Sequence, residues 1–327
     1  MLGIGQSKDS APSSKEPSAK EWKLIERVVM ANTDELKRSR RWGIFFKILT
    51  FVYLFGLLFL FLDASNAGKE GTATGGHTAV IDVQGVIADG KPAGADAVVS
   101  SLRAALKNED TKVVILRINS PGGSPVQSSY IYNEIIRLRD LHPEVPIHSV
   151  ISDSGASGAY YIAAATENIY ANGASIVGSI GVTSAQFGFQ ELLDKLGVER
   201  RQFTSGEHKA FLDPFVELKE EEKALFETLL NDVHQQFIDD VKAGRGDRLK
   251  PTEKTFSGLF WTGRQALEMG LVDGLKSTSE LARELGYEQV VDYTYRPSPL
   301  QSFADSLGVS IAKALLSLSS EQGFSLR

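Results

Sequence analysis

A serine set among small residues is the first candidate for chemistry in this sequence. Ser157 lies in the run DSGASGAYY, directly before an expected helix over 157–166. A serine at the N-terminus of a helix is open to approach and lies beside the positive end of the helix dipole, which suits a nucleophile. Ser154 and Ser157 equally suit the N-cap of that helix, and the run departs from the Gly-x-Ser-x-Gly elbow because residue 159 is Ala159. The serine alone leaves both interpretations open.

Two adjacent glycines form a second candidate site. Gly122 and Gly123 lie in the run NSPGGSP, between the strand-like run VVILRI and an expected helix over 124–140. Glycines let the backbone turn sharply and present bare N–H groups, which can bind a developing oxyanion. An ordinary strand-to-helix turn has the same composition, so this loop alone does not decide between the two.

A third loop offers two basic side chains, His208 and Lys209, in the run SGEHKAF. Either could activate a serine. A lysine base must be neutral, which requires its pKa to fall by roughly 3 from a reference near 10.4 and costs about 4 kcal/mol. Such a base needs a dry, buried site, which Phe211 and Phe215 could help to supply. The alternative is a solvated loop lysine, which is the commoner case.

Metal and cofactor chemistry finds no support in the sequence. The chain has no cysteine, which excludes a disulfide scaffold, a Cys-ligated zinc site, an iron–sulfur cluster and a cysteine nucleophile. None of its five histidines forms a His-x-x-x-His or similar pair, and no Walker phosphate-binding loop is present. We therefore expect no metal and no cofactor.

Strands and helices alternate around these loops, which predicts repeated βαβ units and a mostly parallel α/β sheet. A long helix is expected over 217–243, where apolar residues recur at four-residue spacing, and two shorter helices around 263–269 and 278–285. The remaining expected strands are 79–87, 112–119, 147–152, 168–170, 177–182 and 199–204, and the remaining expected helices are 94–107, 124–140, 157–166 and 188–196.

The N-terminal region predicts a membrane anchor. Residues 1–20 have a disordered composition, a polar helix is expected over 21–41, and 42–62 is apolar apart from Lys47 and Thr50. Those 21 residues would span about 31 Å as a helix, which matches a bilayer core of about 30 Å. A buried core helix and a cleaved signal peptide are the alternatives, but the apolar run and the segment before it are both long for a signal peptide.

The charge distribution gives this anchor an orientation. Residues 1–62 carry ten Lys or Arg and six Asp or Glu, a balance of +4, whereas the rest of the chain has a balance of −10. By the positive-inside rule, residues 1–41 stay in the cytoplasm and the body is exported. We expect a cytoplasmic tail at 1–41, a transmembrane helix at 42–62, a linker at 63–77, a catalytic domain at 78–295 and an amphipathic C-terminal tail at 296–327.

Taken together and in order, the loops resemble one family, signal peptide peptidase A, whose short members are membrane-anchored serine peptidases of the ClpP/crotonase-like fold. The resemblance covers about 78–290 and rests on several motifs at family-like spacing. These are RINSPGGSP at 117–125, SGASGAYYIA at 154–163, IVGSIGV at 176–182, TSGEHKAFLDPF at 204–215, GRGDRL at 244–249 and WTGRQALEMGLVDGL at 261–275.

The resemblance implies a role for each matching position. Ser157 matches the nucleophile, Lys209 the general base of a Ser–Lys dyad, and Ser179 the serine that orients the lysine. The backbone oxyanion site matches Gly122, Gly123 and Gly158. The family more often has glycine at the position of Ala159, and His208 matches no catalytic role.

The resemblance also implies substrates, partners and a location. Family members cut signal-peptide remnants and other membrane-associated peptides, and single-unit members assemble into rings with composite grooves. We therefore expect a homo-oligomer, with an octamer as one candidate number, on the outer side of a bacterial inner membrane, and no nucleic-acid partner. Two alternatives are a crotonase-type acyl-CoA enzyme, which a CoA-binding assay would identify, and an inactive peptide-binding scaffold, which a serine-reactive probe would leave unlabelled.

Overall fold

The computed structural model of the chain describes residues 19–67 and 75–296. The chain divides into two compact units, Met1–Glu70 and Gly71–Arg327. Residues 1–18 of the expected disordered segment 1–20 lie outside the described residues, as do 297–327 of the expected tail 296–327 and 68–74 of the expected linker. Residues 19 and 20 are helical, in contrast to the expected disorder.

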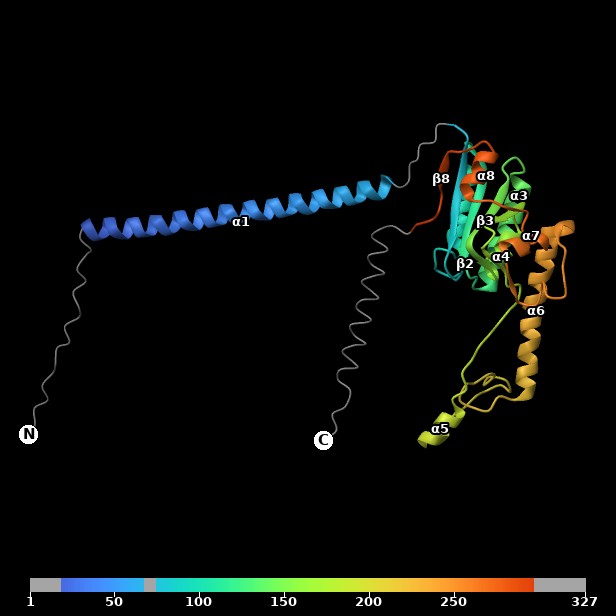
Figure 1. Ribbon diagram of the computed structural model, residues 1–327. Coiled ribbons are helices and arrows are strands. Elements are labelled where there is room, and N and C mark those ends of the chain that lie inside the picture. Colours follow the sequence, from blue (N-terminus) through green and yellow to red (C-terminus); the bar gives the residue numbers. More distant parts are fainter. Residues whose placement is uncertain (1–18, 68–74, 297–327) are drawn as a thin grey trace, which may run out of the picture. The chain divides into compact units, whose positions relative to one another are not determined.

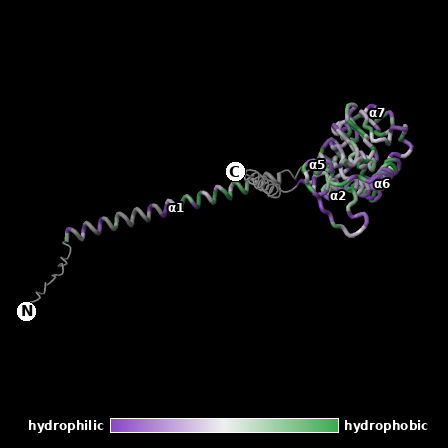
Figure 2. Tube along the Cα trace, turned by 90° about the horizontal axis from the view of Figure 1, so that it is seen from below, coloured by the Kyte–Doolittle hydropathy of each residue, from purple (hydrophilic) through white to green (hydrophobic). Residues whose placement is uncertain are grey.

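A single long helix, α1 (Ala19–Ala67), forms the described part of the first unit (Figure 1). The two segments expected at 21–41 and 42–62 are therefore one continuous helix, which also takes in the start of the expected linker. Its stretch Arg40–Phe59 is long and apolar enough to cross a membrane and is the hydrophobic part of α1 in Figure 2. Phe51 and Phe55 are each 70% exposed, so other described residues do not bury this apolar stretch.

The second unit is built on one twisted sheet with the strand order β6-β5-β3-β2-β1-β8, in which β4 pairs with β3 and β7. Every pairing is parallel except that between β5 and β6. This confirms the mostly parallel α/β class. The strands are β1 (His77–Gln84), β2 (Thr111–Ser120), β3 (Ile147–Ala156), β4 (Asn168–Ala171), β5 (Ile176–Gly178), β6 (Phe260–Thr262), β7 (Gly274–Leu275) and β8 (Val290–Asp292).

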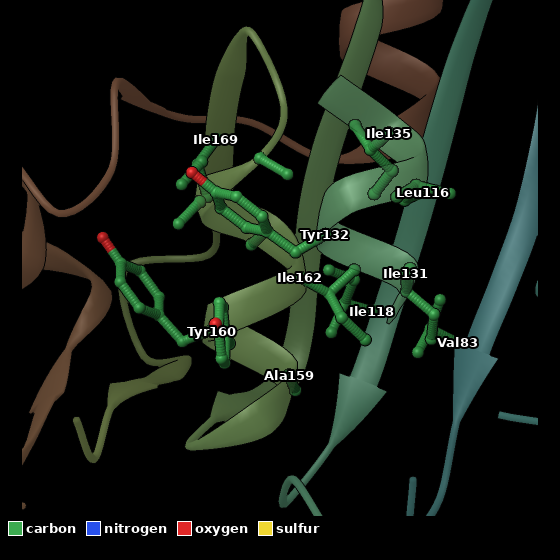
Figure 3. Packing of buried hydrophobic residues seen from close by; sticks show 14 of the residues in the cluster. Val83, Leu116, Ile118, Ile131, Tyr132, Ile135, Ala159, Tyr160, Ile162 and Ile169 are labelled. Carbon is green, nitrogen blue, oxygen red and sulfur yellow. The ribbon is translucent and has the colours of Figure 1, made fainter. Parts of the chain in front are cut away.

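One face of the sheet carries the main hydrophobic core, under α2 (Ala95–Lys107), α3 (Pro125–Leu141) and α4 (Gly158–Ala164). Figure 3 shows Ile131 and Ile135 of α3 packed toward Leu116 and Ile118 of β2. The other face carries a smaller cluster beneath Leu281 of α8 (Thr278–Glu284). Alternate residues of each strand face opposite sides, so two apolar layers fix the register of the strands.

The expected strand over 199–204 is wrong: the structure has no strand there. The segment is exposed, with Phe203 at 92% exposure, and no partner strand pairs with it among the described residues. A strand needs a hydrogen-bonded neighbour, which residue pattern alone does not supply. The expected strand at 177–182 is also shorter, because β5 ends at Gly178.

A segment between β5 and the second half of α6 (Glu220–Arg245) extends beyond the sheet (Figure 1). We call residues 183–233 the arm; it includes α5 (Gln190–Leu196). No residue of α5 is buried, and the buried residues of α6 begin at Phe237. After α6, the short 3-10 helix η1 (Gly246–Arg248) and α7 (Gly263–Glu268) lead the chain back along the sheet.

Candidate active site

The turn from β3 into α4 presents Ser157. Its backbone has φ 53° and ψ −125°, a combination that costs a non-glycine residue about 1–3 kcal/mol and persists only where surrounding contacts hold it. Two hydrogen bonds do so: the Ser157 N–H donates to Gly178 O at 2.7 Å, and the Tyr161 N–H donates to Ser157 O at 3.0 Å. The Ser157 side chain makes no cap hydrogen bond to α4, so it is not serving as an N-cap.

The glycine loop lies directly against this serine. Gly122 has φ +100°, and a Cβ built on it would lie 2.7 Å from the Ser157 Cβ and 2.8 Å from the Gly158 N. Gly123 pairs with Ile87 in an isolated parallel bridge, where a Cβ would meet Ile87 O at 2.0 Å. Glycine is needed at both positions because two backbone segments approach each other too closely for a side chain.

Two of the three proposed oxyanion donors have free N–H groups. The Gly122 N–H donates to Ser120 Oγ at 3.1 Å and is therefore occupied. Among the described residues, no hydrogen bond uses the N–H of Gly123 or of Gly158. A Cβ built on Gly158 would lie 3.4 Å from the Gly123 N, so the two groups are neighbours beside Ser157. The geometry therefore narrows the oxyanion proposal to Gly123 and Gly158.

Ser179 lies on the same cavity wall and also has a strained backbone, with φ 52°. Its N–H donates to Leu259 O at 2.8 Å, at the end of the β5–β6 pairing. Its neighbour Gly178 accepts the hydrogen bond from Ser157 described above. The structure thus brings Ser157, Ser179 and the two free N–H groups to one place, although they come from separate motifs.

These groups line a cavity of about 490 Å³. Its wall combines hydroxyl groups and backbone N–H groups with apolar side chains, as expected for a site that binds a partly apolar ligand. The lining residues are Gly123, Pro125, Ser157, Gly158, Tyr161, Ser179, Gly181, Val182, Thr183, Val233, His234, Phe237, Ser257 and Gly258.

The sequence alone did not point to the α6 wall of this cavity. Phe237 stacks on Tyr161 with ring centroids 4.6 Å apart, and the Tyr161 hydroxyl donates to Asp240. Burial, followed by the hydrogen bond to Asp240, raises the pKa of Tyr161 to about 12, so its phenol stays neutral. The apolar spacing of α6 predicted a helix, but only the fold shows which of its turns faces Ser157.

Lys209 does not line this cavity. It lies in the arm and is exposed, and its backbone N–H donates to Gly206 O at 3.2 Å. The surrounding arm is held by its own contacts: Phe189 and Phe215 stack at 5.5 Å, and the Arg200 guanidinium lies 4.8 Å from the centre of the Phe215 ring. Within one copy of the chain, the cavity therefore brings together Ser157, Ser179 and the two glycines without Lys209.

No group of three or more metal-ligating side chains occurs within 19–67 and 75–296. The polar groups of the cavity are hydroxyls, backbone N–H groups and the imidazole of His234. This donor set suits acyl transfer, in which a nucleophile and an oxyanion site lie side by side.

Comparison with known proteins agrees with this chemistry. Residues 139–292 match the model of peptidase family S49. A putative protease of Synechocystis is 34% identical over 258 residues, which cover 73% of this chain and 90% of that protein. A putative signal peptide peptidase SppA of Enterococcus faecium is 30% identical over 190 residues, which cover 58% of this chain and 55% of that protein.

A further relative has a different name. The Na(+)/H(+) antiporter NhaA of Brucella abortus is 46% identical over 185 residues, which cover 56% of this chain. The chain spans only about a quarter of the length of that relative and of the corresponding protein of Brucella melitensis.

Proposed function

The chain belongs to peptidase family S49, and from this premise we propose that it is a serine peptidase in which Ser157 is the nucleophile and Lys209 the general base. The observation that carries the proposal is the cavity in which a strained, uncapped Ser157 lies beside the free N–H groups of Gly123 and Gly158. An oxyanion site of this kind lowers the barrier by roughly 3–4 kcal/mol per donor in serine peptidases.

The reaction proceeds through an acyl-enzyme. Neutral Lys209 takes the proton from Ser157 Oγ as the oxygen bonds to the peptide carbonyl carbon, and the N–H groups of Gly123 and Gly158 hold the resulting oxyanion. The C–N bond then breaks, and the lysine returns its proton to the leaving amine. Water, deprotonated by the lysine, attacks the ester, and the lysine gives that proton to Ser157 Oγ as the C–O bond breaks, which releases the acid product and regenerates the serine. Ser179 orients the lysine.

In our proposal the lysine reaches this cavity from a second copy of the chain. The arm that carries Lys209 has several exposed apolar side chains, including Phe187 at 81% and Leu196 at 65% exposure. Apolar patches of this kind mark contact surfaces, and a ring of copies would cover them while inserting each arm into the next cavity. The number of copies, for which an octamer is one candidate, is part of this proposal.

The substrates and location form the second part of the proposal. The apolar stretch of α1 anchors the protein in the bacterial inner membrane, with the N-terminus in the cytoplasm and the catalytic unit outside. Signal-peptide remnants and other apolar membrane-associated peptides are the substrates. The names of relatives in Enterococcus faecium and Haemophilus influenzae, a putative signal peptide peptidase and Protease 4, support this assignment.

The decisive experiment is digestion of a synthetic signal peptide by the detergent-solubilised full chain, beside the Ser157→Ala variant. We expect cleavage products from the parent chain only, and stoichiometric labelling of the parent by a fluorophosphonate probe. Equal cleavage by both proteins would assign the activity to a contaminant or to another residue. Binding of coenzyme A without cleavage would favour the acyl-CoA alternative.

A further inference from the structure

His234 is the one imidazole on the wall of the Ser157 cavity among the described residues. It lies on α6, and its Nε2 is 3.1 Å from Ile180 O. A carbonyl oxygen can only accept a hydrogen bond, so Nε2 carries the proton and donates it. The imidazole thereby ties α6 to the backbone residue that immediately follows Ser179.

The backbone around Ser179 depends on hydrogen bonds of this kind. Ser179 has φ 52°, a conformation that residues other than glycine seldom adopt and that persists only where neighbouring contacts hold it. On one side, the Ser179 N–H donates to Leu259 O at 2.8 Å. On the other, Ile180 O accepts both the Gly258 N–H at 3.0 Å and the His234 ring. Of these three hydrogen bonds, the one from the His234 ring comes from α6.

His234 also marks the place where α6 leaves the body of the protein. Phe237 and Val241 follow it at helical spacing on the buried face, whereas no residue of α6 before Phe237 is buried. The arm therefore ends about one helical turn before Phe237, the first buried residue of α6. A hydrogen bond at this point fixes the angle of the arm and the backbone of Ser179 at the same time.

We propose that His234 is a positioning residue for the peptidase reaction, acting through its hydrogen bond to Ile180 to hold Ser179 and the base of the arm in place. The inference rests on the proposed function, because Ser179 and the arm matter to catalysis only if Ser157 is the nucleophile. The proposal uses only the Nε2–H of His234, which donates to Ile180 O, and it gives the ring no part in proton transfer.

The test compares two replacements of the same residue. His234→Gln keeps a side-chain N–H that can donate to Ile180 O, whereas His234→Leu has similar bulk and no donor. We expect His234→Leu to lose about tenfold in kcat with KM nearly unchanged, because one positioning hydrogen bond is lost, and His234→Gln to recover most of the parent rate. Gln235→Leu is the matched control, since Gln235 is exposed on the same helix and its side chain donates a hydrogen bond to Asp239, away from Ile180.

A second measurement needs no activity. In the Ser157→Ala background, hydrogen–deuterium exchange of peptides covering 176–183 and 256–260 reports the hydrogen bonds around Ser179 and Ile180. We expect faster exchange in His234→Leu, with His234→Gln and Gln235→Leu matching the parent.

The outcomes separate this inference from the proposed function. Unchanged exchange and an unchanged kcat in His234→Leu would overturn the inference even if the parent cleaves peptides. Equal kcat losses in the Gln and Leu variants would also overturn it, because the imidazole itself would then be required. If the parent fails to cleave, the proposed function fails, while the exchange experiment still decides whether His234 holds the Ser179 segment.

Discussion

The N–H of Ser157 donates to the carbonyl of Gly178 at 2.7 Å, so the turn that presents the proposed nucleophile is bonded to the residue that precedes Ser179. Each serine has a positive φ and would relax without its neighbours. The bond makes the two turns a single unit: a change that moves β5 also moves Ser157. The proposed lysine-orienting serine and the proposed nucleophile therefore share one backbone hydrogen bond.

The close contact at Gly122 gives a direct test of this unit. In Gly122→Ala, the new methyl group would lie 2.7 Å from the Ser157 Cβ and 2.8 Å from Ala156 O, at a φ that disfavours alanine. We expect at least a hundredfold lower rate of Ser157 labelling by a fluorophosphonate, because displacement of a nucleophile by about 1 Å has effects of this size.

The matched control for this variant is Gly188→Ala, since nothing lies within 4 Å of a Cβ at Gly188. That variant should label at the parent rate. Normal labelling of Gly122→Ala would show that the glycine loop does not touch the nucleophile as the structure has it.

The two turns of this site could be predicted from short stretches of the sequence. Paired glycines after a strand, and a serine between a strand and a helix, predicted both turns, because turn chemistry depends on neighbouring residues. The partner of each turn could not be predicted in this way. That Gly178 holds Ser157, or that Gly123 pairs with Ile87, depends on strand order and register.

In the arm, by contrast, the local sequence pattern gave a wrong prediction. Residues 199–204 have the composition of a strand but find no neighbour within the described part of the chain, so the pattern misleads. In our proposal the position of Lys209 relative to Ser157 likewise depends on contacts with a second copy of the chain, which no local pattern records. Local sequence patterns therefore identify candidate residues, whereas the position of the arm depends on contacts that these patterns do not record.

The buried pair Arg245 and Asp273 makes a prediction about stability. Arg245 is 1% exposed and makes two hydrogen bonds to Asp273, each of 2.8 Å. In Asp273→Asn the guanidinium keeps its charge without its partner, so we expect the free energy of unfolding to fall by about 3–5 kcal/mol. Asp82→Asn, which breaks the exposed pair with Arg117, should cost about 0–1 kcal/mol. Chemical denaturation in detergent at pH 7 measures both.

The same pair predicts a pH dependence. Burial alone would raise the pKa of Asp273, but hydrogen bonds from Arg245 and from the Ile169 N–H outweigh it and hold the pKa below its ordinary value. The stabilisation is therefore complete above the unfolded pKa of about 3.9 and is lost as the pH falls through the lower folded pKa. The difference between the parent and Asp273→Asn should shrink in strong acid. A difference that persists undiminished there would contradict the assignment.

The topology proposed for α1 is tested by protease protection. Protease added outside spheroplasts should digest the catalytic unit after residue 71 and leave an epitope tag at residue 5 protected, because the proposed orientation keeps the basic residues before Trp42 in the cytoplasm. Detergent should expose the tag and serves as the control. Digestion of the tag in intact spheroplasts would reverse the orientation.

The proposed dyad predicts the effects of three single variants. Ser157→Ala and Lys209→Ala should each lose peptide cleavage by several orders of magnitude, and the double variant should be no worse, since residues that act together lose activity non-additively. His208→Ala should keep substantial activity. A loss in His208→Ala as deep as in Ser157→Ala would assign the base to histidine.

A sharper prediction concerns which copy supplies the lysine. If Lys209 enters the cavity of a neighbouring copy, then Ser157→Ala and Lys209→Ala are defective in different parts of a shared site. Co-expressed and co-purified, the two variants would form some cavities that pair an intact Ser157 with an intact Lys209. With random mixing in equal amounts, about one quarter of cavities would be intact, so activity should return to roughly that fraction of the parent. The same two proteins, purified separately in detergent and mixed just before the assay, control for residual activity. If co-assembly is shown by differential tags and no activity returns, the lysine must come from the same copy, through a movement of the arm toward its own Ser157.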